Sequence, residues 1–333
     1  PHPVEGRTGT VDRCRGKPRI MKRVPPHLRR FAIFLFVFGT GFTGLVYEIT
    51  WQKYLARLLG SDTSATAVVI GVFLGGLSLG YLLIGRHSVR AGNPMKLYAL
   101  LEAIIGVWCA LFPLIFDGCR AWTAGWSFAP PLWMLIEGTG CAALLMLVPT
   151  VCMGATIPLL TRSLSVDVNA ATRIHARLYA VNTAGACGGA LITGFVLIPV
   201  LGLPLTVMSA SAVNLTAALF FAILASAPGT AGSADASTPE QALSAAPLPA
   251  FPIYAVGFLG GFSVMTLENV LFRIGALSLG SSSYSFSLVL SVFLFAIAAG
   301  SAIVSRLGRI GPSTLFWNQL LFAIALAALY FTL

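Results

Sequence analysis

Charged residues are scarce in this sequence: 10% of its 333 residues are Asp, Glu, Lys or Arg, whereas 57% are hydrophobic. A soluble domain usually carries about 25% charged residues, so these few charges could not cover a globular surface. The same apolar composition excludes an intrinsically disordered chain. Most of the outer surface is therefore expected to face lipid.

The residue patterns of most catalytic and metal-binding sites are also missing. The four His do not share a metal-ligand spacing, and the six Cys include no C-x-x-C pair, so we interpret the cysteines as small buried hydrophobic residues. No phosphate loop, catalytic triad or dinucleotide fingerprint is present, and the alternating α/β pattern of a nucleotide-type cofactor domain is absent. The residues themselves therefore predict no catalytic residue, no metal site and no cofactor.

Positive charge is concentrated at the N-terminus, where nine of the 21 Lys and Arg precede residue 31. Most of the others fall in short loops that would share one side of a membrane with that segment. This distribution favours contact with anionic lipid headgroups over nucleic acid. By the positive-inside rule it predicts a multi-pass protein of the plasma (inner) membrane with a cytoplasmic N-terminus.

The apolar residues form long runs, and a run of about 20 is needed for a helix to cross the hydrocarbon. These runs are too uniform for the alternating strands of a membrane barrel. The sequence predicts an all-α, polytopic bundle of about nine transmembrane helices, at residues 31–51, 63–85, 97–116, 130–149, 177–199, 203–226, 251–270, 284–305 and 313–333.

An internal repeat divides the chain. Residues 41–86 align without a gap with 261–306, with matched Glu, Arg and Gly residues. An even number of helices separates the copies, which favours parallel six-helix units of the kind found in transporters, with the second unit incomplete. The predicted organisation is a basic cytoplasmic segment, a first unit, a flexible Ala/Ser/Pro/Gly linker and a second, truncated unit, at 1–30, 31–226, 227–250 and 251–333.

Ionisable groups inside a membrane are costly and usually face a bundle interior or a cavity. The candidate intramembrane polar site consists of Glu48, Glu268, Glu102 and Asn182. The repeat places Glu48 and Glu268 at equivalent depths, where together they could hold a proton or a cationic solute. The alternative is that each acid pairs with a nearby base, Lys53 or Arg273, and only fixes packing. Asn182 could hydrogen-bond across helices or line a cavity.

Small residues mark predicted helix contacts, because glycine lets two backbones approach closely. The candidate helix-packing glycines are Gly71, Gly75, Gly76, Gly80, Gly185 and Gly189. Two prolines, Pro149 and Pro158, interrupt the fourth apolar run. They predict either a kink beside a central cavity or a helix end at the cytoplasmic face.

Several segments resemble one known family. They are Gly41–Trp51, Leu97–Glu102, Met153–Leu160, Leu178–Ala186 and Gly194–Pro199. Together they resemble the membrane region of the integral-membrane spermidine synthase-like proteins, which join a major-facilitator-like region to a spermidine synthase. The resemblance extends over roughly residues 30–333. It implies a membrane region followed by a cytosolic domain that transfers an aminopropyl group from decarboxylated S-adenosylmethionine to putrescine.

This sequence departs from that pattern because no such domain follows within it, so no catalytic residue can be carried over and enzyme activity of this chain is left uncertain. Three functions stay open. The first is a membrane platform for an aminopropyltransferase domain, fused or separate. The second is a transporter-like module for polyamines or another small cationic solute. The third is an assembly subunit whose glycine faces bind other membrane proteins.

Overall fold

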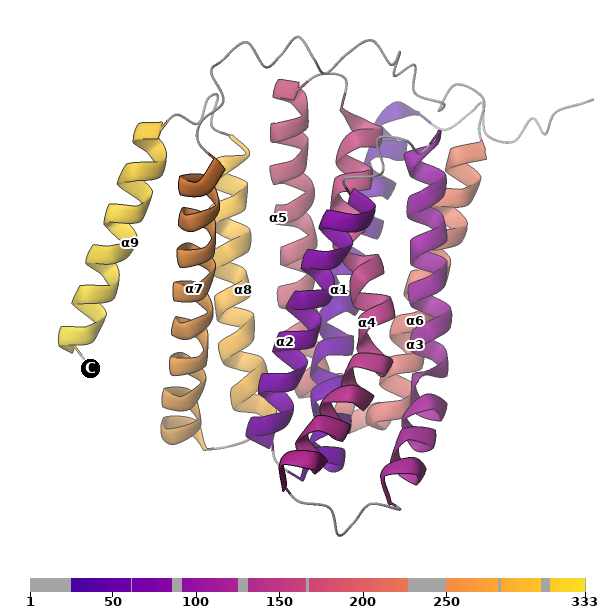
Figure 1. Ribbon diagram of the computed structural model, residues 1–333. Helices are drawn as coiled ribbons and strands as arrows, with labels where there is room; N and C mark the ends of the chain where they lie inside the picture. The colour runs from indigo at the N-terminus through magenta and orange to yellow at the C-terminus, as the bar shows by residue number, and fades with distance from the viewer. Residues whose placement is uncertain are drawn as a thin grey trace, which may run out of the picture.

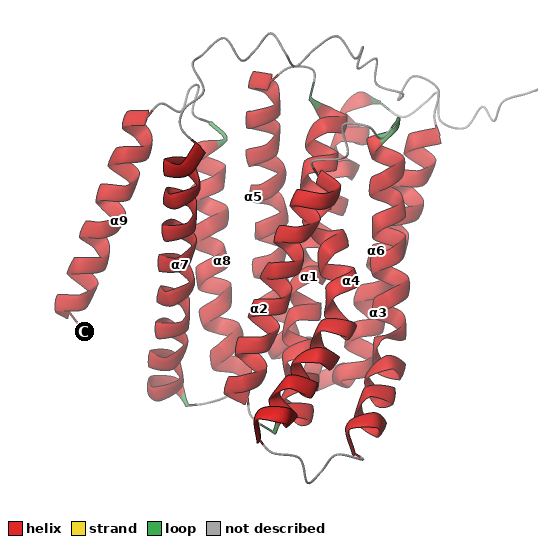
Figure 2. Cartoon of the chain, in the orientation of Figure 1, coloured by secondary structure: helices red, strands yellow, loops and turns green. Residues whose placement is uncertain are grey.

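The computed structural model describes residues 25–60, 62–85, 92–124, 131–165, 168–226, 250–280, 283–306 and 312–332. Within these ranges every regular element is helical and there is no strand, which confirms the predicted all-α class (Figure 2). Most of the predicted basic segment, and nearly all of the predicted linker, lie outside the described residues.

Long helices run side by side and alternate in direction (Figure 1). Their bounds are α1 Pro26–Leu59, α2 Asp62–Gly80, α3 Pro94–Ala124, α4 Pro131–Leu164, α5 Val168–Ile192, α6 Ile198–Ser226, α7 Ala250–Leu279, α8 Ser283–Val304 and α9 Pro312–Thr332. Two π-helical turns, η2 at Tyr81–Gly85 and η4 at Thr193–Leu197, continue α2 and α5.

Within the described residues, seven helical stretches are long and apolar enough to cross a membrane. One of them, Ala170–Ser226, has 57 residues, which is enough for two crossings. It bends at Gly202, whose φ of 71° and ψ of 173° interrupt the helical backbone. A positive φ is easily adopted only by glycine. The chain therefore turns between the predicted spans 177–199 and 203–226.

Helix α4 continues through Pro149 and Pro158 to Leu164, well beyond the predicted span, so neither proline ends the helix. A proline inside a helix leaves the carbonyl four residues earlier without its usual donor. For Pro149 that carbonyl belongs to Leu145, and the Trp108 indole Nε1 on α3 donates to it at 2.8 Å. A neighbouring helix thus satisfies the backbone that the proline frees.

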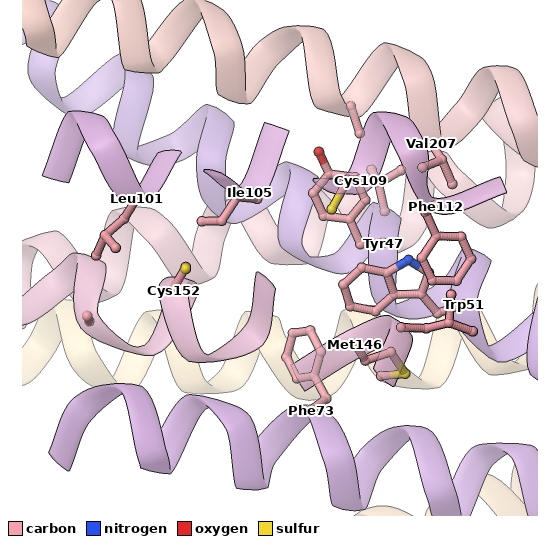
Figure 3. Close-up of a cluster of buried hydrophobic side chains, with 14 of the residues drawn as sticks. Tyr47, Trp51, Phe73, Leu101, Ile105, Cys109, Phe112, Met146, Cys152 and Val207 are labelled. Carbon is pink, nitrogen blue, oxygen red and sulfur yellow. The ribbon is translucent and has the colours of Figure 1, made fainter. Parts of the chain in front are cut away.

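The first six helices form the compact part of the molecule. Its main helix pairs are α1 with α5, α3 with α6, and α2 with α4. In the centre, the Trp51 ring stacks between Tyr47 and Phe112, with ring centroids 5.5 Å away on each side (Figure 3). This aromatic column joins α1 to α3 and fixes how α1 is rotated in the bundle.

Helix α8 attaches to this core by packing on α5, and α7 packs on α8. Helix α9 stands at the edge of the molecule, and most of its described side chains are exposed (Figure 1). Helix α5 and its continuation η4 contact both α1 of the first predicted unit and α8 of the second. The two predicted units therefore meet along α5 and η4.

Backbones approach most closely at glycines. A Cβ at Gly80 would collide with the backbone carbonyl of Val151, and one at Gly76 with the Thr150 side chain, so both bring α2 against α4. A Cβ on Gly185 or Gly189 would collide with α1 backbone in the same way, at the residues Phe38 and Phe42.

The remaining pair of candidate packing glycines lies differently. A Cβ at Gly71 or Gly75 would meet nothing within 4 Å, and both residues are exposed. The predicted helix contact through these two residues is therefore absent from the described structure. The physical reason is the rotation of α2, which turns the Gly76 and Gly80 side of the helix toward α4 and leaves the other side outward.

Candidate functional site

Glu48 and Glu268 come together although 220 residues separate them in the sequence. Glu48 is half-buried on α1, and Glu268, on α7, is 8% exposed. Their carboxyl groups lie close enough to interact electrostatically. These two acids align with each other in the internal repeat, and the fold brings both of them to one region of the bundle.

Neither acid has the basic partner that a purely structural role predicts. Among the described residues, an ion pair forms elsewhere, between Asp117 and Arg120, and neither Glu48 nor Glu268 forms an ion pair or a hydrogen bond there. Arg273, one helical turn beyond Glu268, is exposed. Buried carboxylates are ordinarily paired or hydrogen-bonded, so this pair requires a cation or a proton from outside the described structure.

A small apolar cluster lies beside the two acids. It consists of Leu45, Ile49, Ala186, Ala190 and Leu290, with Phe272 and Phe286 packed against it. These residues come from α1, α5, α7 and α8, so the cluster lies where the last helices dock on the core. We call this contact the α5 seam.

Glu102 lies in a different place, inside the six-helix core, where it is 1% exposed. The Asn214 Nδ2 on α6 donates to Glu102 Oε2 at 2.7 Å, and the Tyr47 hydroxyl on α1 donates to Asn214 Oδ1 at 2.8 Å. This network connects α1, α3 and α6 through neutral donors, so it satisfies the acid without an ion pair.

Asn182 is apart from all three acids. Its Nδ2 donates to the backbone carbonyl of Val37 on α1 at 3.3 Å. A Cβ at Gly41 would collide with the Asn182 backbone carbonyl, so α1 and α5 are in close contact there. Of the two interpretations left open, the structure shows the cross-helix hydrogen bond.

The candidate polar site therefore separates into two sites and one helix contact. Sequence reasoning missed Asn214, the polar centre of the Glu102 network. The signal was available, because Asn214 is an amide within the long apolar run of α6. Polar side chains in such a run usually hydrogen-bond across helices.

Metal binding has no support in the part of the chain that the structure describes, where no group of three or more His, Cys, Asp or Glu is placed to hold an ion. The described cysteines are free thiols, at Cys109, Cys119, Cys141, Cys152 and Cys187. All but Cys187 are buried, as expected for small apolar residues.

Three curated relatives are similar to this chain, and all are polyamine aminopropyltransferases. The one from Corynebacterium efficiens is 28% identical over 185 residues, which cover 54% of this chain and 32% of the relative. Polyamine aminopropyltransferase 2 of Streptomyces coelicolor is 30% identical over 192 residues, 56% of this chain and 33% of the relative. Polyamine aminopropyltransferase 1 of that organism is 28% identical over 176 residues.

No family model matches the chain, and no solved structure matches it. The matches to the curated relatives cover about a third of the length of each. This chain is thus similar to polyamine aminopropyltransferases over about half of its length. Its described residues form an all-α bundle.

Proposed function

We propose that this chain is the membrane region of a protein related to the polyamine aminopropyltransferases, and that it holds an aminopropyltransferase domain at the cytoplasmic face of the plasma membrane. The domain is carried either by the same polypeptide or by a separate one. The supporting observation is the similarity to three such enzymes.

The extent of that similarity supports a membrane role. A matched stretch of 185 residues in this chain must include several of the long apolar helices, because helices occupy most of residues 26–332. The shared part is therefore helical, whereas the larger part of each relative lies outside the match. A helical membrane region shared by several such enzymes is what a platform for their catalytic domain would require.

The platform is tested by following the enzyme activity in cells that carry the gene. Transfer of an aminopropyl group from decarboxylated S-adenosylmethionine to putrescine is measured in membrane and soluble fractions. We expect most of this activity in the membranes, and we expect it to be recovered with an affinity-tagged copy of the chain. Activity that remains wholly soluble, and that deletion of the gene does not alter, would contradict the proposal.

A second candidate function, transport of a small cationic solute, is favoured by one specific observation. Glu48 and Glu268 interact electrostatically, and neither forms an ion pair with a described residue. Two carboxylates without a counter-charge inside a membrane bundle suit a positively charged solute.

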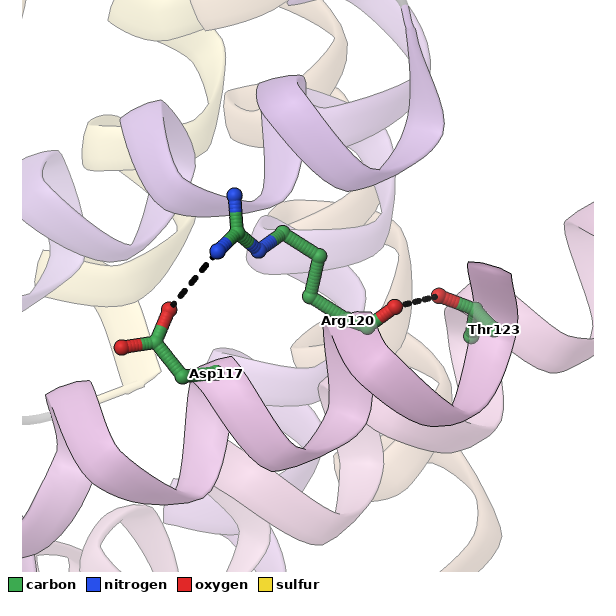
Figure 4. A network of polar contacts seen from close by, with 3 residues as sticks. All are labelled: Asp117, Arg120 and Thr123. Carbon is green, nitrogen blue, oxygen red and sulfur yellow. Dashed lines mark hydrogen bonds and ion pairs between the residues drawn. The ribbon is translucent and has the colours of Figure 1, made fainter. Parts of the chain in front are cut away.

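Transport is tested by uptake of labelled putrescine into proteoliposomes. Glu48→Gln and Glu268→Gln each remove one negative charge while keeping the side-chain shape, and each is expected to reduce uptake about tenfold, the effect of losing one charged hydrogen bond. The control is Asp117→Asn on α3, whose carboxylate is 65% exposed and 3.6 Å from Arg120 (Figure 4). Equal uptake by all four proteins would exclude these acids from transport.

A further inference from the structure

Two hydroxyl groups at the α5 seam are buried without any hydrogen-bond partner. They are Thr193 Oγ1 at the start of η4 and Ser287 Oγ on α8, and both residues are 0% exposed. Buried polar atoms are paired in the great majority of cases, so an unpaired one requires an explanation. Both hydroxyl groups lie near the region of Glu48 and Glu268, which suggests that one explanation applies to both.

The register of α1 and α5 places Thr193 near the level of Glu48. A Cβ at Gly185 would meet the carbonyl of Phe38, and one at Gly189 the carbonyl of Phe42, so the two helices run parallel with a constant offset. Continued by one turn, this offset brings Thr193 to the level of Val46, within one turn of Glu48 at about 1.5 Å per residue. Contacts between α1 and η4 agree with this placement.

The register of α5 and α8 brings Ser287 to the same stretch. The Cys187 thiol donates to the Ser291 carbonyl at 3.2 Å, and the Phe195 and Tyr284 rings are 5.2 Å apart. These two contacts fix an antiparallel pair, and Ser287 lies between them. Ser287 also shares its helix face with Leu290, a member of the seam cluster one turn away.

Helix α7 completes the arrangement. The Phe272 ring stacks on Phe286 of α8 with ring centroids 4.7 Å apart. Glu268 is one turn before Phe272 and therefore lies on the same face of α7, toward the seam. This orientation agrees with the burial of Glu268 and with its electrostatic interaction with Glu48.

The backbone at Thr193 is irregular as well. Thr193 begins the π-helical turn η4, which contacts both α1 and α8. Single π-helical turns inside α-helices occur frequently at functional sites. Interrupted membrane helices commonly line the ion and substrate sites of transporters.

We propose that the α5 seam is a binding site for a small primary diammonium cation, formed by the Glu48 and Glu268 carboxylates and the Thr193 and Ser287 hydroxyls. A primary ammonium group has three hydrogen-bond donors and no acceptor, which suits carboxylate and hydroxyl oxygens. Two positive charges match two acids, whereas a single sodium ion would leave one of them uncompensated. This site would be the solute site of the second candidate function, transport, and the proposal rests on that function only for the class of solute.

Binding is measured by titration calorimetry on the purified chain in mild detergent, with putrescine, butylamine and sodium chloride as separate probes. We expect putrescine to bind at least tenfold more tightly than butylamine, because the monoamine leaves one acid unpaired. Thr193→Val and Ser287→Ala are each expected to weaken putrescine binding about tenfold. Thr193→Ser keeps the hydroxyl and should restore binding, and Asp117→Asn is the control.

The outcomes separate the site from transport. If putrescine binds the wild type, Thr193→Val loses this binding, and proteoliposomes show no putrescine uptake, the result would support the site and contradict the transport function. Binding of equal strength in the wild type, Thr193→Val and Ser287→Ala would overturn the assignment of the hydroxyls. Binding of sodium but not of putrescine would overturn the ligand class, and no binding of any probe to the folded protein would overturn the site.

Discussion

Asn214→Leu is expected to lower the free energy of unfolding by about 3 kcal/mol, because it leaves a buried acid without its donor. Asn214 Nδ2 donates to Glu102 at 2.7 Å, and its Oδ1 accepts from the Tyr47 hydroxyl at 2.8 Å. Leucine has the same number and branching of side-chain heavy atoms but neither polar group. The loss is measured by titrating the protein in mild detergent with a denaturing detergent and following tryptophan fluorescence.

A second variant distinguishes lost hydrogen bonds from lost packing. Replacing both partners of a buried hydrogen bond by apolar groups can be nearly neutral, whereas removing one is costly. The double variant Glu102→Leu/Asn214→Leu should therefore be more stable than Asn214→Leu alone, and adding Tyr47→Phe should recover further stability. Losses that simply add in the double variant would show that the network does not couple α3 to α6.

Gly80→Ala is expected to destabilise the protein by about 2 kcal/mol, because the new Cβ collides with the Val151 carbonyl on α4. A flexible side chain could rotate away, but a backbone carbonyl cannot, so α2 and α4 must separate. The same unfolding titration measures the effect.

The matched control is Gly75→Ala on the same helix, where the new Cβ meets nothing within 4 Å. Alanine favours a helix interior over glycine by about 1 kcal/mol in water, so this variant should be neutral or slightly more stable. If the two alanine variants have equal stability, close approach at Gly80 does not hold α2 against α4.

Some features of this protein follow from local sequence alone. The helices lie close to the predicted spans because long apolar runs must satisfy their own backbone hydrogen bonds in lipid. The acids Glu48, Glu102 and Glu268 could be selected without a fold, since an ionisable group in an apolar run is rare and costly. Several helices extend beyond the predicted spans, and the end of α4 differs most, because the donor that carries this helix through Pro149 is Trp108 of another helix.

The grouping of those residues was decided by the tertiary structure. Lipid and protein interior are similarly apolar, so sequence alone does not say which side of a membrane helix faces inward. The rotation of α2 about its own axis packs Gly80 on α4 and turns Gly75 outward. Helix packing also pairs Glu102 with Asn214 across 112 residues, and it brings the buried hydroxyls of Thr193 and Ser287 to the α5 seam. Side-chain partners this far apart in sequence meet only when whole helices pack.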